Sequence, residues 1–309
     1  MRDSAIRTLI EMGKKDKDIN LVTGDLGFGV LKPYWEALPN QFINAGIAEQ
    51  NMTAAAAGMA LEGKKVFTYS IGNFPTLRCL EQIRNDCAYH NANVNVICVG
   101  GGFVYGSLGM SHHATEDIAI LRALPDVTVF CPGDVTEAEE CVKAAAQIDG
   151  TCYIRLGRGG EGRVLDSIDF KAGKAIKIRE AKDFEKKVAL FSTGAILREA
   201  QTACDKLEEA GIGVEQYSFP TVKPIDEEVI KSCADKYDYI FTVEEHNIVG
   251  GFGSAVAEVM AEYGGKAKLV RLGINDVYCT KVGNQAYLRE QYGISAAKIA
   301  ERIQGVLSE

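Results

Sequence analysis

One glutamate stands out among the residues whose type and surroundings could support chemistry. Glu49 follows Gly46 and Ala48 and precedes the small-residue run 54–58. Small side chains allow two backbones to approach closely, so this pattern predicts a helix packed at a tight contact with the acid caught in it. Burial disfavours the charged form of a carboxyl group, so Glu49 could share a proton with a ligand. The alternative is an ordinary surface glutamate in the first turn of a helix.

Two further candidates come directly after predicted strands. Asp25 follows the strand 19–23, and Phe74 follows the strand 66–70 and a Gly-Asn turn. In open parallel sheets ligands gather beyond the carboxyl ends of the strands, so both side chains could reach one site. Each also has a structural interpretation, Asp25 as a turn residue and Phe74 as part of the core.

A glycine run and two of the four histidines lie between residues 99 and 117. The glycines at 100–102 follow a strand, but no lysine follows with the spacing of a P-loop, so we reject a nucleotide site. His112 and His113 are neighbours, and on a helix their side chains would point about 100° apart. One of them could move protons during catalysis while the other packs in the core.

Two arginines occur at the end of another predicted strand, 153–155. The guanidinium fork suits phosphate, carboxylate or sulfonate groups. Arg155 lies within the strand, and we expect it to pair with an acid inside the fold. Arg158 follows the strand and remains a candidate for an anionic ligand.

The composition is that of a globular protein with one large or two ordinary domains. The chain has 309 residues, 47% apolar and 25% charged, and a net charge of −8, which disfavours nucleic acid and anionic membranes as partners. It has no apolar run of 18 residues, and the mixed charges at its start lead us to expect no secretory signal. Its nine cysteines include no CxxC pair, so we expect reduced thiols in a cytoplasmic protein, without a zinc site.

Short β-branched runs alternate with helical segments, which predicts an α/β fold with mostly parallel sheets flanked by helices. The alternation weakens after about residue 157, where glycines and then charged residues follow. We interpret residues 1–165 as one domain, 166–187 as a linker that could include short edge strands, and 188–309 as a second domain. The other strands that we expect are 94–99, 127–131, 188–192, 214–217, 239–243 and 268–271.

Two segments carry a resemblance to a known family. Residues 44–63, with the string Gly-Ile-Ala-Glu-Gln around Glu49, resemble the pyrimidine-binding segment of the transketolase superfamily of thiamine-diphosphate enzymes. Residues 244–254, Glu-Glu-His-Asn followed by a glycine turn, resemble a segment of the transketolase C-terminal domain. The resemblance runs from about residue 3 to 300 but covers only half of a transketolase. It implies a pyrimidine-binding domain followed by a transketolase C-terminal domain.

The resemblance also implies roles for individual residues. In this family the glutamate matched by Glu49 hydrogen-bonds a ring nitrogen of the aminopyrimidine and activates the cofactor. His112 would contact sugar hydroxyls and manage their protons, and Arg158 would hold the anionic end of the substrate. The implied cofactor contacts are Glu49, Phe74, Asp25 and Ile71, the last in place of an aromatic residue, and the implied substrate contacts are His112, Arg158 and Asp25.

Three positions are left open by the resemblance. Leu108 stands where many relatives carry an acid that touches a substrate hydroxyl, so the ketose donor and the aldose acceptor are not defined. His113 and His246 match the family without an assigned role.

The diphosphate-binding half of the family is missing from this sequence. That half carries a Gly-Asp-Gly motif whose groups hold Mg²⁺, and the nearest string here is Gly24-Asp25-Leu26-Gly27. Hard cations need converging oxygen ligands, so we assign no metal ligand to this chain. The resemblance implies that a separate subunit supplies the diphosphate and Mg²⁺ site, in an α₂β₂ heterotetramer with thiamine diphosphate between unlike chains.

The function implied is that of a split-transketolase subunit, active only with its partner. It would transfer a two-carbon ketol unit from a ketose to an aldose, with anionic or phosphorylated sugars as substrates. Two alternatives stay open. A 2-oxo-acid dehydrogenase β subunit or a deoxyxylulose-phosphate-synthase-like enzyme would release carbon dioxide from pyruvate. A non-catalytic regulatory subunit would leave the activity of its complex unchanged after Glu49→Gln.

Overall fold

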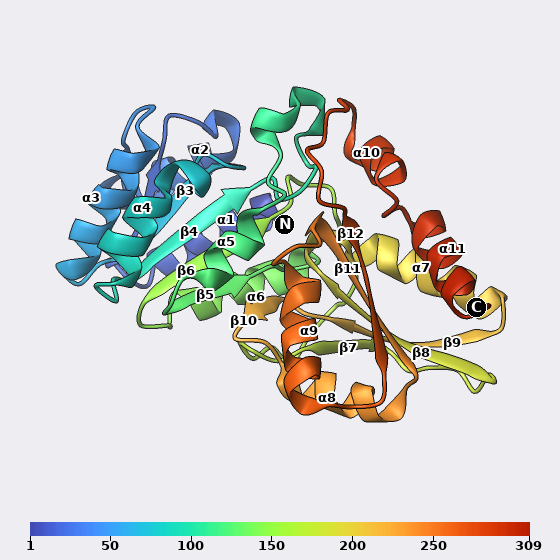
Figure 1. The fold of residues 1–309 in the computed structure, drawn as a ribbon. Helices are drawn as coiled ribbons and strands as arrows, with labels where there is room; N and C mark the ends of the chain where they lie inside the picture. Colours follow the sequence, from blue (N-terminus) through green and yellow to red (C-terminus); the bar gives the residue numbers. More distant parts are fainter.

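The computed structural model describes residues 1–309 and divides them between two sheets flanked by helices (Figure 1). The first sheet has the strand order β10-β5-β6-β4-β3-β1-β2, and the second has the order β12-β11-β8-β9-β7. Every pairing is parallel except β10 with β5 and β7 with β9. The predicted α/β class, with two mostly parallel sheets, is therefore confirmed.

The first sheet is formed mainly by the N-terminal half of the chain. Its strands are β1 (Ile19–Thr23), β2 (Phe42–Asn44), β3 (Lys65–Ile71), β4 (Val94–Val99), β5 (Val127–Phe130), β6 (Thr151–Leu156) and β10 (Thr221–Lys223). The helices of this half are α1 (Arg2–Gly13), α2 (Phe28–Ala37), α3 (Glu49–Leu61), the short α4 (Leu80–Gln82), α5 (Asp117–Ala123) and α6 (Val135–Ala145). β1, β3, β4, β5 and β6 correspond to expected strands, and their buried β-branched residues explain why the sequence signal is strong.

The second sheet is formed by the C-terminal half. Its strands are β7 (Ile176–Arg179), β8 (Lys186–Thr193), β9 (Ile212–Ser218), β11 (Tyr239–Asn247) and β12 (Lys268–Ile274). Its helices are α7 (Leu197–Glu209), α8 (Glu227–Lys236), α9 (Phe252–Tyr263), α10 (Gln285–Gln291) and α11 (Ala296–Val306). β7 lies within the range 166–187 that we interpreted as a linker, and it pairs with β9 as an antiparallel edge strand.

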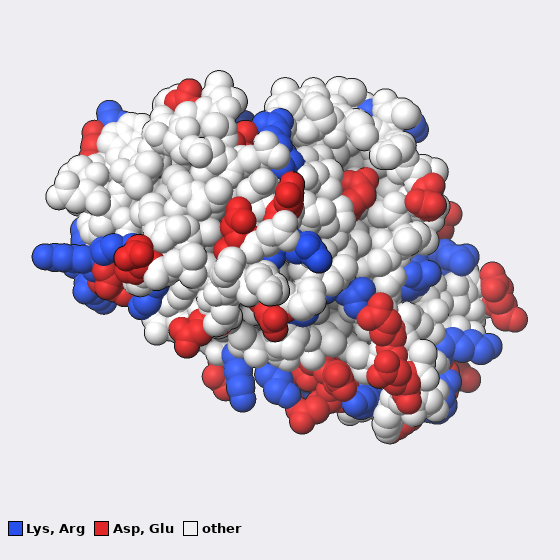
Figure 2. Space-filling model, turned by 60° about the vertical axis from the view of Figure 1, so that its left-hand side comes forward, with Lys and Arg blue, Asp and Glu red and all other residues white.

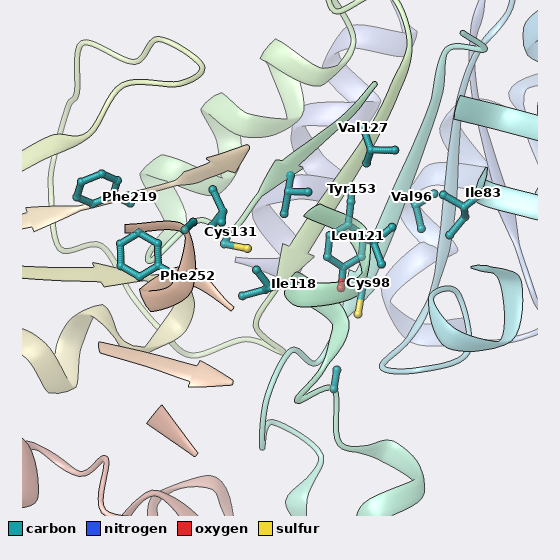
Figure 3. Packing of buried hydrophobic residues seen from close by; sticks show 14 of the residues in the cluster. Ile83, Val96, Cys98, Ile118, Leu121, Val127, Cys131, Tyr153, Phe219 and Phe252 are labelled. Carbon is teal, nitrogen blue, oxygen red and sulfur yellow. The ribbon is translucent and has the colours of Figure 1, made fainter. Parts of the chain in front are cut away.

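The two halves of the chain are joined by more than the connecting segment. β10 comes from the C-terminal half but pairs with β5 of the first sheet, and the Cys131 N–H donates to the Pro220 carbonyl at 2.8 Å. One cluster of 34 buried apolar residues extends across both halves. Figure 3 shows Phe219 and Phe252 of the second half near Cys131 and Ile118 of the first. The two domains therefore share part of one core.

The side chain of Asp134 connects the end of the first domain to the start of α6 by hydrogen bonds. Asp134 caps this helix by accepting the Glu137 N–H at 2.8 Å, and its second oxygen accepts the N–H groups of Val164 and Leu165 at 2.7 and 3.1 Å. We expect Asp134→Ala to lower the free energy of unfolding by about 2–4 kcal/mol, because it removes a helix cap and leaves further N–H groups unpaired. Urea denaturation followed by circular dichroism measures this loss, and a change below about 0.5 kcal/mol would contradict it.

Candidate active site

Glu49 occupies the first position of α3, at the carboxyl edge of the first sheet. Its side chain is only 4% exposed. A Cβ atom at Gly24, just after β1, would lie 3.2 Å from the Glu49 Cγ, so this glycine leaves the space that the side chain fills. The Glu49 carbonyl accepts the Thr53 hydroxyl at 2.9 Å within the helix. The buried acid that the small-residue pattern predicts is present.

The small residues around Glu49 divide between two faces of α3. Met52, Ala56 and Ala57 are buried against the sheet, whereas Ala54, Ala55 and Gly58 are exposed. The helix ends before Gly63, whose φ of +90° suits glycine at a helix terminus. The small side chains thus pack one face within the chain and leave the other face open.

The Glu49 carboxylate is paired with a cation in this chain. Arg78 Nη1 donates to Glu49 Oε2 at 2.7 Å, across 29 residues of sequence. The Arg78 guanidinium also lies over the Phe74 ring, with Cζ 4.5 Å from the ring centroid. Sequence reasoning missed Arg78, because a lone arginine in the turn after β3 gives no signal of its distant partner.

Asp25 lies in the loop after β1, close to the start of α3. Its carboxylate accepts the Asn44 side-chain amide at 2.9 Å, and its own N–H donates to the Asn44 oxygen at 3.1 Å. The same Asn44 oxygen accepts the Gly46 N–H at 3.0 Å. Asn44 therefore holds the Asp25 loop against the turn that leads to Glu49. Asp25 has a φ of +57°, a left-handed conformation that aspartate tolerates in turns.

Phe74 and His112 lie together although 38 residues separate them. Their rings meet edge to face with centroids 5.3 Å apart. The Asn73 side-chain amide donates to the His113 carbonyl and so ties the turn after β3 to the loop after β4. Ile71, the last residue of β3, is partly exposed at the start of the same turn. The structure thus brings the predicted cofactor and substrate residues of these two loops together.

A line of rings and cations connects these residues to Arg158. The His112 ring lies 6.5 Å from the Tyr105 ring, and the Arg158 Cζ lies 5.5 Å from the Tyr105 centroid. Together with Phe74, these side chains form a continuous row from Arg78 to Arg158. Burial raises the pKa of Tyr105, so its hydroxyl keeps its proton at neutral pH. Sequence reasoning did not identify Tyr105 because an aromatic residue in a glycine-rich loop resembles a core residue.

The glycine run at 100–102 makes room for side chains rather than for a phosphate. A Cβ atom would lie 2.3 Å from Tyr105 at Gly100, 2.7 Å from Arg155 at Gly101 and 2.5 Å from Glu245 at Gly102. Only residues without a side chain permit these approaches.

The histidines left without a role are buried. His113 packs edge to face on Phe103, and burial lowers its pKa. His246 accepts the Ala119 N–H at 3.3 Å on Nε2 and lies 2.6 Å from the Asn247 carbonyl on Nδ1. Burial lowers the pKa of His246 to about 4, so its ring is neutral. Both rings pack inside the protein rather than in the row described above.

Arg155 forms a buried ion pair, as expected from the sequence. Its Nε donates to Asp117 Oδ2 at 2.7 Å, and its Nη2 donates to the carbonyls of Ala114 and Glu245 at 2.7 and 3.0 Å. Burial opposes the charge of Asp117, but the adjacent guanidinium outweighs it and lowers the pKa of the acid. Arg155 also connects the two domains, because the Glu245 carbonyl to which it donates belongs to β11.

The loop with Leu108 also rests on the second domain. The Gly283 N–H donates to the Gly106 carbonyl at 3.3 Å, and Leu108, Met110 and Val282 are each more than half exposed. This loop lies at the top of the molecule in Figure 1 beside the segment that precedes α10. Leu108 therefore presents an apolar, accessible side chain in this loop.

A pocket of about 370 Å³ adjoins Glu49 and is lined by residues 47–51 and Arg78. A larger hollow of about 650 Å³ lies between residues 84–90 and 124–126, at the amino ends of β4 and β5. Ligands of parallel sheets bind beyond the carboxyl ends of strands, so the smaller pocket is the better candidate site.

No group of three or more His, Cys, Asp or Glu side chains is arranged to hold a metal ion. No helix has both the length and the apolar composition needed to cross a bilayer.

Comparison with known proteins supports the resemblance on both domains. Residues 1–160 match the family described as transketolase, pyrimidine binding domain, and residues 173–299 match transketolase, C-terminal domain. The chain belongs to the transketolase family. It is 38% identical over 307 residues to a putative transketolase C-terminal section of Methanocaldococcus jannaschii, covering 98% of this chain and 95% of that protein.

Two further relatives are of nearly the same length as this transketolase-family chain. It is 34% identical to an apulose-4-phosphate transketolase subunit of Phocaeicola vulgatus, covering 97% of this chain and 95% of that protein. A solved structure described as a split gene transketolase, inactive beta4 tetramer, superposes with a TM-score of 0.88 and 34% identity, covering 99% of this chain and 97% of that chain. The prediction of a transketolase subunit is confirmed, and with it membership of a family that depends on thiamine diphosphate.

Proposed function

We propose that the chain is the pyrimidine-binding subunit of a two-chain transketolase that moves a two-carbon ketol unit from a ketose to an aldose. The observation that carries the proposal is the buried carboxylate of Glu49 at the start of α3, in line with Phe74 and His112. An acid at this place can exchange a proton with a flat heterocycle that rests against an aromatic ring.

The residues around Glu49 fit the pyrimidine end of thiamine diphosphate. The fit rests on the accessible pocket beside Glu49 and on the close approach of Gly24, where any Cβ would crowd the acid. Glu49 would hold a ring nitrogen by a hydrogen bond, and Phe74 would support the ring. When bound, the cofactor supplies the electron sink that carbon–carbon cleavage needs.

The remaining site residues would act on the sugar. His112 is partly exposed, and Ser111 Oγ lies 3.0 Å from its Nδ1, which orients the ring. It would hold sugar hydroxyls and exchange their protons. Asp25, held by Asn44, would lie at the other side of Glu49 near the cofactor and the reacting carbons. Leu108 leaves the sugar open, because it offers no hydrogen bond where relatives have an acid.

The diphosphate and Mg²⁺ would be held by a separate subunit, in an α₂β₂ assembly in which the cofactor lies between unlike chains. The carboxyl edge of the first sheet supports such a partner, because large apolar side chains remain exposed after successive strands. The top of the molecule, where the loop 106–112 lies in Figure 1, is mostly uncharged in Figure 2. The exposed residues at this edge are Phe28, Ile47, Leu77, Leu108 and Met110.

Reconstitution tests the function. The chain is combined with a diphosphate-binding transketolase subunit, thiamine diphosphate and Mg²⁺, and ketol transfer between a phosphorylated ketose and an aldose is followed by product analysis. We expect a two-carbon extension of the aldose. Release of carbon dioxide from pyruvate without ketol transfer would instead favour the alternative enzyme class.

Arg158 provides a test of substrate charge. We expect Arg158→Met to raise the KM for a phosphorylated aldose by about 10- to 100-fold, because an interaction between a guanidinium and a phosphate contributes about 1.5–3 kcal/mol. The KM for an unphosphorylated sugar should change little, which serves as the internal control. Equal increases for both sugars would show that Arg158 does not recognise the phosphate.

A further inference from the structure

Arg78 contacts both residues that the proposed function assigns to the pyrimidine ring. Its Nη1 donates to the buried carboxylate of Glu49 at 2.7 Å, and its guanidinium lies over the face of Phe74 with Cζ 4.5 Å from the ring centroid. A guanidinium is planar, carries N–H donors at its edge and stacks on aromatic rings. An aminopyrimidine held by the same two residues would use the same two kinds of contact.

We infer that Arg78 is a placeholder that occupies the pyrimidine position while the cofactor is absent and that it withdraws when the cofactor binds. This inference rests on the proposed function, because it assumes that Glu49 and Phe74 hold the pyrimidine. It predicts a competition between an internal cation and the incoming ring.

The structure indicates which partner moves. Glu49 is 4% exposed and begins a helix, whereas the Arg78 side chain is 46% exposed and lies in the single turn Leu77–Cys79. The guanidinium donates no hydrogen bond except the one to Glu49. Arg78 can therefore turn into solvent or toward a partner subunit without breaking another hydrogen bond, while the acid stays in place.

The placeholder also has a structural reason. A carboxylate buried without a partner is unfavourable, so the start of α3 would be less stable if no group bonded Glu49. Arg78 satisfies the acid until the ring takes over its hydrogen bond. The consequence is a lower apparent affinity for the cofactor, since binding must first displace the cation.

The test compares Arg78→Ala with the wild-type chain in the reconstituted two-chain enzyme. Titration with thiamine diphosphate gives the apparent Kd and the kcat at saturation. We expect Arg78→Ala to bind the cofactor about fivefold more tightly, as befits a half-exposed ion pair, with a loss in kcat smaller than this gain in affinity. Arg7→Ala removes an exposed cation on α1 that has no ion pair, and it should change neither quantity.

Two outcomes would overturn the inference. If kcat falls tenfold or more and the affinity does not rise, Arg78 instead positions Glu49 during catalysis. If neither the apparent Kd nor the kcat changes, Arg78 takes part neither in cofactor binding nor in catalysis. A crystal structure of the holoenzyme decides the matter independently of how well the variant folds, because Arg78 still bonded to Glu49 and stacked on Phe74 beside a bound ring would refute displacement.

The failure of the proposed function gives a different result. If the wild-type enzyme binds no thiamine diphosphate with its partner and Mg²⁺ present, both proposals fall together. If the wild-type enzyme binds it and transfers ketol units while Arg78→Ala does not bind more tightly, only the placeholder is excluded.

Discussion

Replacing Glu49 with glutamine is expected to lower the kcat of the reconstituted transketolase by about 10²- to 10⁴-fold, the range that a well-placed acid or base contributes. Glutamine has nearly the same shape and can keep a hydrogen bond, but it cannot exchange a proton with the ring. Steady-state measurement of ketol transfer at saturating thiamine diphosphate gives the effect on kcat separately from any effect on binding.

The matched control for this variant is Glu62→Gln at the end of the same helix. Glu62 is exposed, so its replacement should leave kcat unchanged. A Glu49→Gln enzyme that retains most of the wild-type kcat would remove the basis of the proposed mechanism. It would support the non-catalytic alternative if the partner subunit alone accounted for the activity.

Replacing Arg155 with methionine is expected to lower the free energy of unfolding by about 3–5 kcal/mol, because it leaves the charge of Asp117 buried without its partner. The substitution also removes the donors to the carbonyls of Ala114 and Glu245, so the contact between the domains weakens. Urea denaturation followed by circular dichroism measures the loss, and limited proteolysis reports whether the domains separate.

An exposed pair supplies the comparison. Lys266 pairs with Asp238 at 3.1 Å, with the two side chains 55% and 82% exposed, so Lys266→Met should cost about 1 kcal/mol or less. If the two variants lost similar amounts of unfolding free energy, burial would not make the Asp117 pair more important for stability than an exposed pair.

The sequence predicted the parts of the site whose local pattern reflects their environment. The small residues around Glu49 correctly indicated that the acid is buried, although Ala54, Ala55 and Gly58 of the same run are exposed on the other face of α3. The strands were found where β-branched residues run together, as in β1 and β4, since buried parallel strands need apolar side chains on both faces.

Other features depend on contacts that no local pattern records. Arg78 donates a hydrogen bond to Glu49, which lies 29 residues earlier in the chain. Tyr105 belongs to the site through its contacts with His112 and Arg158. β2 and β10 are three residues long, too short for a periodic signal, and β10 is a strand only because β5 lies beside it.

The pairing of β10 with β5 has a consequence for how the protein is made. A ribosome must synthesise the chain as far as Lys223 before the last strand of the first sheet exists. Until then β5 presents unpaired backbone groups along its outer side, which is the kind of edge that recruits strands from other chains. Fragments that stop before residue 221 lack this strand and part of the shared core, so we expect them to aggregate.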